Sequence, residues 1–283
     1  ILLHSYDNCI FYAIRLALNL IRNAEQKLSK LGFVGTGSIT VAIVEGLHAG
    51  EAPAPAILVS PRNAQNAKRL AAAFKGVSVA HDNQQIVDES DITLLAVRPQ
   101  VAEEVVRALR FRNGQKLVSL VAGIGADTLQ TWISEKVDIV QAIPLPFVAA
   151  RLGFTVICPP DNAAIALFDR VGSTLGIEDQ RSLKVFFAAS AMMGLYFGLL
   201  ETASDWLLKE GLEGSAAKHY LNSLFAGLSH AALNSGADFP DLRHEFSTKG
   251  GINEQLFRVF SEHGGRSALH EGLDAVMARL NKA

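Results

Sequence analysis

The chain has 283 residues, enough for about two domains, and 49% of its residues are hydrophobic while 19% are charged. This composition excludes extensive disorder, and a net charge of -2 gives no reason to expect nucleic acid or an anionic membrane as a partner. Two cysteines, Cys9 and Cys158, cannot form a disulfide framework and suit a reducing cytoplasm. Because few side chains are charged, we expect part of the surface to be hidden at a subunit interface. The composition therefore predicts a cytoplasmic, compact and oligomeric protein.

Residues 1–29 form an extension before the first predicted domain. Residues 10–21 (IFYAIRLALNLI) are apolar apart from Arg15 and Asn19, but this run is shorter than the roughly 20 residues that span a bilayer. The extension has neither the basic leading segment nor the small-residue cleavage site of a signal peptide. We expect an amphipathic helix that packs on the protein. A membrane-surface anchor is less favoured, because the polar face of the helix carries few basic residues.

The segment from residue 30 to residue 50 has the pattern of a dinucleotide-binding turn. Residues 31–34 are typical of a short buried strand, Gly35-Thr36-Gly37 of a tight turn, and residues 38–47 of a helix. The glycines let the backbone approach a pyrophosphate, and the helix N-terminus supplies unpaired N–H groups. Thr40 stands at the third small position of this pattern, where Gly or Ala is the better match.

The second predicted strand, residues 56–60, ends without the acidic residue that usually holds the ribose of NAD. Ser60-Pro61-Arg62-Asn63 stands there instead, and an arginine with hydroxyl and amide neighbours suits a 2′-phosphate. We therefore expect NADP(H) to be preferred over NAD(H). The alternative is that Arg62 only caps a solvated loop.

Strands and helices then alternate along the chain. Strands are predicted at residues 77–80, 92–97, 117–123 and 139–143, and helices at residues 63–74, 101–109 and 126–134. This alternation predicts an α/β fold, a doubly wound parallel sheet with helices on both faces and a ligand at the carboxyl ends of the strands. The loops at residues 35–38, 60–63, 97–100 and 122–124 should converge on the cofactor.

The remainder of the chain is predominantly helical after Pro159-Pro160. Helices are predicted at residues 165–175, 195–209, 215–233 and 256–280, with a polar loop at residues 239–255. Broad apolar faces with small residues commonly pack against a second copy of the chain. We therefore predict a dinucleotide-binding domain at residues 30–182 and a helical dimerisation and substrate domain at residues 183–283.

From residue 31 onward the chain resembles the pyrroline-5-carboxylate reductase family, the enzymes that make proline. The resemblance is carried by residues 32–40 (GFVGTGSIT), 97–100 (VRPQ), 122–124 (AGI), 143–144 (IP) and 247–253 (STKGGIN), and by a long helix at residues 201–212. Several positions depart from the family pattern, among them Ile252-Asn253, which stands where the family has paired threonines. Leu145 replaces an asparagine, Met192 and Met193 fill glycine positions, and Lys249 replaces a proline.

The resemblance implies a site at which NADPH reduces an imine. The implied substrate loop contains Thr248, Gly250 and Gly251, which would bind a carboxylate, and Asn253, which would bond the ring nitrogen. Lys249 would add positive charge there, unless it is a solvated loop lysine. Together with the strand ends, the resemblance implies these cofactor-binding residues: Gly35, Thr36, Gly37, Ser38, Ile39, Ser60, Arg62, Asn63, Asn83, Val97, Arg98, Pro99, Ala122 and Gly123.

The leading hypothesis is therefore a reductase that converts 1-pyrroline-5-carboxylate to proline and forms a homodimer or higher homo-oligomer through its helical domain. The alternatives are a reductase of another imine or of a keto or hydroxy acid, and an inactive NADP-binding regulatory homologue. Lys218 and Asn222, one helical turn apart, resemble the catalytic pair of the β-hydroxyacid dehydrogenases, but the nearby glycines are wrongly spaced. The eight histidines, His219 and His230 among them, lack the spacing of metal ligands, so we expect no metal site.

Overall fold

A computed structural model describes residues 30–281, so the predicted helix in the extension lies outside the described residues. The chain divides into two compact units between Ala188 and Ala189. We call the part before this boundary the sheet unit and the part after it, to Val276, the helical unit. The boundary lies within helix α8 (Gln180–Ser190), which also contains the predicted domain border between residues 182 and 183.

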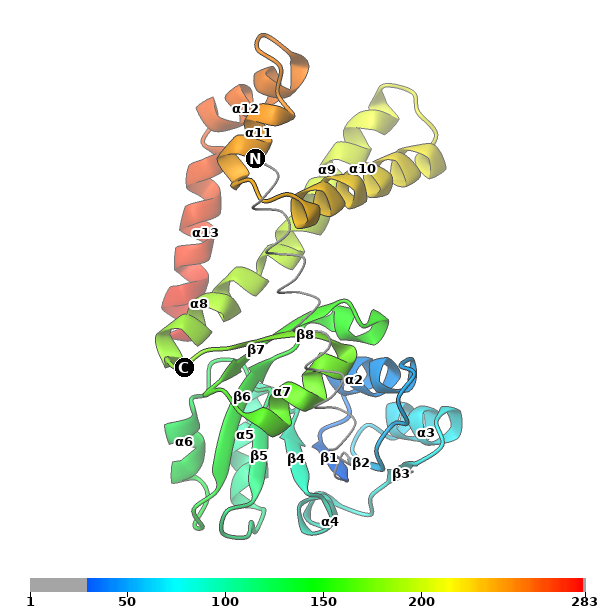
Figure 1. The fold of residues 1–283 in the computed structure, drawn as a ribbon, viewed down its shortest axis with the longest axis vertical. Helices are drawn as coiled ribbons and strands as arrows, with labels where there is room; N and C mark the ends of the chain where they lie inside the picture. Colours follow the sequence, from blue (N-terminus) through cyan, green and yellow to red (C-terminus); the bar gives the residue numbers. More distant parts are fainter. Residues whose placement is uncertain (1–29, 282–283) are drawn as a thin grey trace, which may run out of the picture. The chain divides into compact units, whose positions relative to one another are not determined.

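The sheet unit is built on one eight-stranded sheet with the order β3-β2-β1-β4-β5-β6-β7-β8 (Figure 1). Every neighbouring pair is parallel except β6 and β7, which are antiparallel. The fold class expected from the sequence is therefore confirmed, with one antiparallel pair added. The strands are β1 (Leu31–Val34), β2 (Ile57–Val59), β3 (Val77–Val79), β4 (Ile92–Leu95), β5 (Lys116–Ser119), β6 (Asp138–Ile143), β7 (Gly153–Cys158) and β8 (Gly172–Gly176).

Helices cover both faces of this sheet, and each face has its own apolar core. Successive strand residues point to opposite faces, so Phe33 joins one buried cluster and Val34 joins the other. The first cluster includes residues of α2 (Ser38–His48), α3 (Ala64–Ala73) and α7 (Asn162–Phe168). The second includes residues of α4 (Asn83–Glu89), α5 (Pro99–Arg107) and α6 (Ala126–Thr131). Both faces of the central parallel strands β1, β2 and β4 are thus buried, which explains their continuous hydrophobic sequences.

The helix predicted at residues 165–175 is wrong in its second half. Helix α7 ends at Phe168, a short 3-10 turn (Asp169–Val171) follows, and Gly172 begins strand β8. Gly172 has φ +154, and a Cβ atom there would lie 1.9 Å from the carbonyl oxygen of Gly153. This close approach to β7 is a contact between distant segments, which helical spacing within residues 165–175 does not reveal.

The helical unit contains α9 (Met192–Lys209), α10 (Gly214–Asn234), α11 (Phe239–Glu245), α12 (Ile252–Glu262) and most of α13 (Gly265–Leu280) (Figure 1). Two predictions are wrong here. The expected single helix at residues 256–280 is broken at Gly264, which has φ +80. The expected loop at residues 239–255 contains α11, which begins with Phe239-Pro240, because proline suits the first turn of a helix.

Much of the apolar surface of the helical unit is exposed. No residue of α9 is buried within the described chain, and Phe197 and Trp206 on this helix are 63% and 61% exposed. Among the described residues, the continuous helical stretch Gln180–Lys209 is also long and apolar enough to cross a membrane by length and composition. Exposed apolar surface of this extent marks an interaction site.

Candidate active site

The four predicted cofactor loops follow β1, β2, β4 and β5. These strands are parallel neighbours, so their carboxyl ends lie along one edge of the sheet. Strand β1 pairs with β2 on one side and with β4 on the other, which makes this position the switch point of the sheet. Ligands of doubly wound sheets bind in the crevice at such a point. The topology therefore brings the predicted loops to one edge, while their role in binding stays a prediction.

The two glycines of the first loop differ in what they do for the fold. Gly35 has φ +107, and a Cβ atom there would lie 2.4 Å from the Ala96 carbonyl oxygen. Gly37 is the N-cap of α2 without a side-chain cap, and a Cβ atom there would have nothing within 4 Å. Thr40, which stands at the third small position of the glycine pattern, is fully buried. Its hydroxyl donates to the Gly35 carbonyl at 2.8 Å and so stabilises the turn.

Hydrogen bonds lock the glycine turn to the loop after β2. The buried Thr36 hydroxyl donates to the Ser60 carbonyl at 2.7 Å, and the Asn66 amide donates to the Thr36 carbonyl at 3.0 Å. The Asn63 side chain caps α3 by accepting from the Asn66 backbone N–H at 3.2 Å. These hydrogen bonds connect three of the predicted cofactor residues, Thr36, Ser60 and Asn63, in one network. Sequence reasoning missed Asn66, because its side chain acts on a carbonyl 30 residues away and belongs to no local motif.

The residues at this edge fit an NADP(H) cofactor. Ser60 Oγ and Asn83 Oδ1 are buried, and neither has a hydrogen-bond partner in the described part of the chain. Buried polar atoms are rarely left unpaired, so a ligand with hydroxyl and phosphate groups would satisfy them. Arg62 is exposed beside Ser60, and the open N-terminus of α2 offers N–H groups to a diphosphate.

The loops after β4 and β5 complete the predicted cofactor edge. Arg98 is exposed and is the N-cap of α5, with Pro99 at the first helical position. Val97 packs on the second apolar cluster. Ala122 and Gly123 are half-buried, and Gly123 has φ +79. Ser38 and Ile39 lie in the first turn of α2, so every predicted cofactor residue except Asn83 belongs to one of the four loops or to the helix turn that follows it.

The predicted substrate residues lie together in the loop between α11 and α12 and at the start of α12. The backbone N–H groups of Gly250 and Gly251 already donate hydrogen bonds to other residues of the same segment. Gly250 has φ +73, and its N–H donates to the Glu254 carboxylate at 2.6 Å. The Gly251 N–H donates to the Thr248 carbonyl at 2.8 Å. A Cβ atom on Gly251 would lie 2.4 Å from Thr248 Oγ1, so this glycine is required by the loop itself.

Asn253 also has a partner within the unit, since its side-chain amide donates to the Phe246 carbonyl at 2.7 Å. A pocket of about 550 Å³ adjoins the loop and is lined by Arg243, Gly250, Gly251, Glu254, Gln255, Phe257 and Arg258. Lys249 is exposed. The pocket carries more positive than negative side chains, which favours an anionic ligand. Sequence reasoning missed Glu254 and both arginines.

The departures from the family pattern have different surroundings. Leu145 packs on a small apolar cluster that includes Cys158, whose thiol pKa is raised by burial and by the carboxylates of Asp179 and Glu178. Met192 is 45% exposed, and Met193 is half-buried.

The residues of the rival hypotheses lie on α10. Lys218 and Asn222 are both exposed, and His230 contacts Asn234 on the same helix. No group of metal-ligating side chains occurs among residues 30–281.

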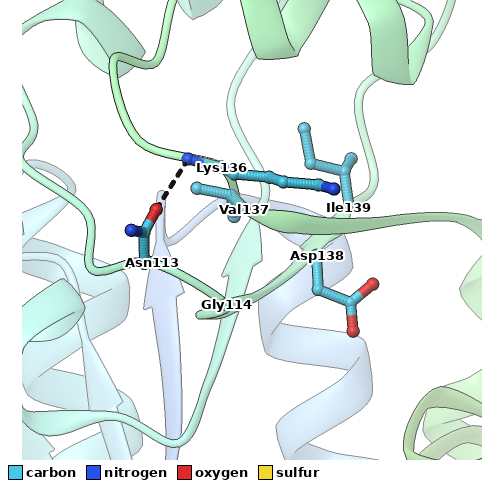
Figure 2. A pocket seen from close by; sticks show the side chains of 6 residues that line it. All are labelled: Asn113, Gly114, Lys136, Val137, Asp138 and Ile139. Atoms are coloured by element: carbon cyan, nitrogen blue, oxygen red, sulfur yellow. Dashed lines mark hydrogen bonds between the residues drawn. The ribbon is translucent and has the colours of Figure 1, made fainter.

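A second pocket, of about 450 Å³, lies at the opposite edge of the sheet, among residues just before and at the start of β5 and β6 (Figure 2). The Lys136 N–H donates to the Asn113 side chain at 3.0 Å, and the Lys136 and Asp138 side chains point in different directions. Asp138 is paired with Lys116, which also bonds Asp161 at 2.6 Å. This pocket therefore lies away from the cofactor loops, and its carboxylate is already paired.

Both parts of the chain match families of known proteins. Residues 30–123 match the family model described as NADP oxidoreductase coenzyme F420-dependent, and residues 182–283 match that of pyrroline-5-carboxylate reductase dimerisation. Pyrroline-5-carboxylate reductase of Pseudomonas aeruginosa is 26% identical over 260 residues, covering 88% of this chain and 95% of the relative. Pyrroline-5-carboxylate reductase 2 of Bacillus subtilis is 27% identical, covering 83% and 88%.

Solved structures of the same enzymes share the fold. The 1-pyrroline-5-carboxylate reductase of Streptococcus pyogenes matches with a TM-score of 0.80 at 19% identity, over 90% of this chain and 99% of that one. The Plasmodium falciparum pyrroline carboxylate reductase, solved with NADP bound, matches with a TM-score of 0.75 at 18% identity, over 89% and 97%. The two models occupy the sheet and helical parts in order, and the relatives span nearly the whole chain. Together, these matches support membership of the chain in the pyrroline-5-carboxylate reductase family.

Proposed function

We propose that this protein reduces 1-pyrroline-5-carboxylate to proline with NADPH. The observation that carries the proposal is the cofactor edge of the sheet unit, in a chain that matches pyrroline-5-carboxylate reductases over most of its length. At this edge lie an open glycine turn, a helix N-terminus without a side-chain cap and the exposed Arg62. The buried Ser60 hydroxyl beside them has no partner among the described residues.

The reaction asks little acid–base chemistry of the protein. Bound NADPH supplies the hydride, and the protonated ring nitrogen of the substrate makes the neighbouring carbon electrophilic. The protein has to orient the two ligands and to hold the substrate carboxylate. In this proposal the N–H groups at the start of α2 hold the diphosphate, and the loops after β4 and β5 hold the nicotinamide end. Thr248, Gly250, Gly251 and Asn253 hold the substrate, aided by Lys249.

The preference for NADPH over NADH is the part of this proposal that depends on Arg62. Its guanidinium suits the 2′-phosphate, and no acidic side chain stands at the end of β2 to select the free ribose hydroxyl. Arg62→Ala should lower the ratio of NADPH to NADH affinity by about tenfold, as expected for a lost charge-assisted contact. Arg107→Ala removes an exposed arginine from α5 and is the matched control. An unchanged ratio in Arg62→Ala would refute the assignment.

The catalytic proposal is tested by following NADPH oxidation with 1-pyrroline-5-carboxylate and with a panel of other cyclic and linear imines. Turnover of the pyrroline substrate, lost in Gly251→Val but with NADPH binding retained, is the expected result, because a side chain at Gly251 clashes with Thr248. Turnover only of other imines would favour the alternative substrate. NADPH binding without any turnover would favour an inactive homologue, an alternative that gains support from the internally bonded Gly250 and Gly251 amides.

Assembly is the remaining part of the proposal. The helical unit matches a dimerisation model and exposes apolar side chains along α9, so we propose a homodimer formed through this unit. Cytoplasmic localisation remains our expectation from cysteine usage. Light scattering of the purified protein tests the dimer, and a monomer at micromolar concentration would refute it.

A further inference from the structure

The loop that follows β5 is braced by one buried side chain of the neighbouring strand. Gln141 of β6 is 3% exposed. Its Nε2 donates to the Ile124 carbonyl at 2.9 Å, and its Oε1 accepts from the Ala126 N–H at 3.2 Å. The two bonded residues flank Gly125, the N-cap of α6. A single planar amide therefore fixes the backbone on both sides of one glycine.

The register of the sheet explains why this brace sits at the cofactor edge. Gln141 lies opposite Ser119, the last residue of β5, so it stands where that strand ends. The loop beyond contains Gly123, with φ +79, and Gly125, and glycines give a backbone more freedom than other residues. Besides Gln141, the loop is held by the buried Ile124 side chain and by a bond of 3.3 Å from the Val121 N–H to Ser119 Oγ.

We propose that Gln141 is a positioning residue for the nicotinamide end of the cofactor, acting through residues 122–125. The inference rests on the proposed binding of NADPH. In a doubly wound sheet with this strand order, one half of a dinucleotide lies on the β2 side of the switch point and the other on the side of β4 and β5. The adenosine end therefore lies near Ser60 and Arg62. Gln141 braces only the loop assigned to the other end.

The division of the cofactor into two ends gives the test. Adenosine 2′,5′-bisphosphate carries only the adenosine end, whereas NADPH carries both. Gln141→Met keeps the side-chain volume and removes both hydrogen bonds. It should weaken NADPH binding about tenfold, the scale expected for two lost buried bonds, and leave the dissociation constant of adenosine 2′,5′-bisphosphate within about twofold. Both constants are measured by isothermal titration calorimetry.

Gln115 provides a matched control within the same sheet. It is also a buried glutamine with two bonds to the backbone: Nε2 donates to the Val87 carbonyl at 2.6 Å, and Oε1 accepts from the Arg112 N–H at 3.1 Å. It precedes β5 and so lies at the opposite, amino edge. Gln115→Met should lower the stability of the protein comparably and change the affinity for neither ligand.

The possible outcomes separate this inference from the proposed function. Unchanged NADPH affinity in Gln141→Met, or an equal loss for both ligands, would overturn the positioning role. Wild-type protein that binds neither ligand would overturn the proposed function, and the inference with it. If Gln141→Met fails to fold, Gln141→Leu decides, because it also removes both hydrogen bonds and its different shape repacks the site differently. It should weaken NADPH binding severalfold and leave adenosine 2′,5′-bisphosphate unaffected, whereas unchanged NADPH affinity would overturn the role.

Discussion

The two glycines of the turn after β1 should respond to the same substitution in opposite ways. Gly35 is demanded by the backbone, because it has φ +107 and a Cβ atom would lie 2.4 Å from the Ala96 carbonyl oxygen. Gly37 is not demanded by the ligand-free fold, because its φ is -83 and a Cβ atom would have nothing within 4 Å. If Gly37 is there to let a diphosphate approach, alanine at this position will affect binding and not folding.

The structure sets the size of each effect. In Gly35→Ala, positive φ costs about 1–2 kcal/mol and the close contact adds about 1–3 kcal/mol, so the free energy of unfolding should fall by about 2–5 kcal/mol. In Gly37→Ala, the poorer N-cap is offset by the lower entropy of the unfolded chain, and the change should stay below about 1 kcal/mol. The added methyl group should weaken NADPH binding by at least about tenfold.

Urea unfolding and NADPH titration of the two variants measure these effects. Gly76→Ala is the control for backbone strain alone, because Gly76 has φ +89 while the nearest atom to an added Cβ is Pro55 O at 3.9 Å. It should cost only the smaller conformational part, about 1–2 kcal/mol. Unchanged NADPH affinity in Gly37→Ala would refute the diphosphate assignment. A loss of stability in Gly37→Ala equal to that in Gly35→Ala would refute the steric reasoning.

Three further predictions follow from charged and buried groups. Although burial lowers the pKa of Lys116, hydrogen bonds to two aspartates raise it overall, so Lys116→Met should cost about 1–2 kcal/mol at pH 7. Because the folded-state pKa is raised, this difference in urea unfolding should shrink as the pH rises above 10.5, and a constant difference would contradict the pairing. In a Cys9→Ser background, the buried Cys158 thiol should react with a thiol reagent only on unfolding, and rapid reaction of native protein would contradict its burial. Glu254→Ala frees the Gly250 N–H to bind the substrate carboxylate, so the KM for 1-pyrroline-5-carboxylate should fall by up to about tenfold in steady-state assays. A raised KM would show instead that the Glu254 side chain supports the loop.

The parts of the fold that were predictable from sequence are those specified by local signals. A buried apolar run, a glycine turn and helical spacing follow one another between Leu31 and His48, and the structure has strand, turn and helix at those positions. The apolar spacing of strand β8 indicates a helix, but its conformation depends on Gly153, its partner in the preceding strand β7. Gly264 was overlooked because one glycine does not interrupt an apolar spacing that is helical on both sides.

The same distinction applies to the candidate site. Glycines and an arginine at strand ends are visible in the sequence, because the turn chemistry is carried by adjacent residues. Gln141 and Asn66 are not visible in this way. Each acts through a backbone atom, 17 residues away for Gln141 and 30 residues away for Asn66, and neither belongs to a motif. Buried amides that brace a loop from another element become apparent only when the register of the strands is known.

The two halves of the proposed site differ in what one protomer can provide. All predicted cofactor residues lie within the sheet unit, where the buried Ser60 Oγ has no partner among the described residues. In the helical unit the position is reversed, because the Gly250 and Gly251 amides already have partners while Phe197 and Trp206 on α9 are exposed. A turn can be built by its own chain, but an apolar helix face is buried only by another surface. We therefore expect cofactor binding to require only the protomer, and substrate binding to depend on assembly of the helical unit.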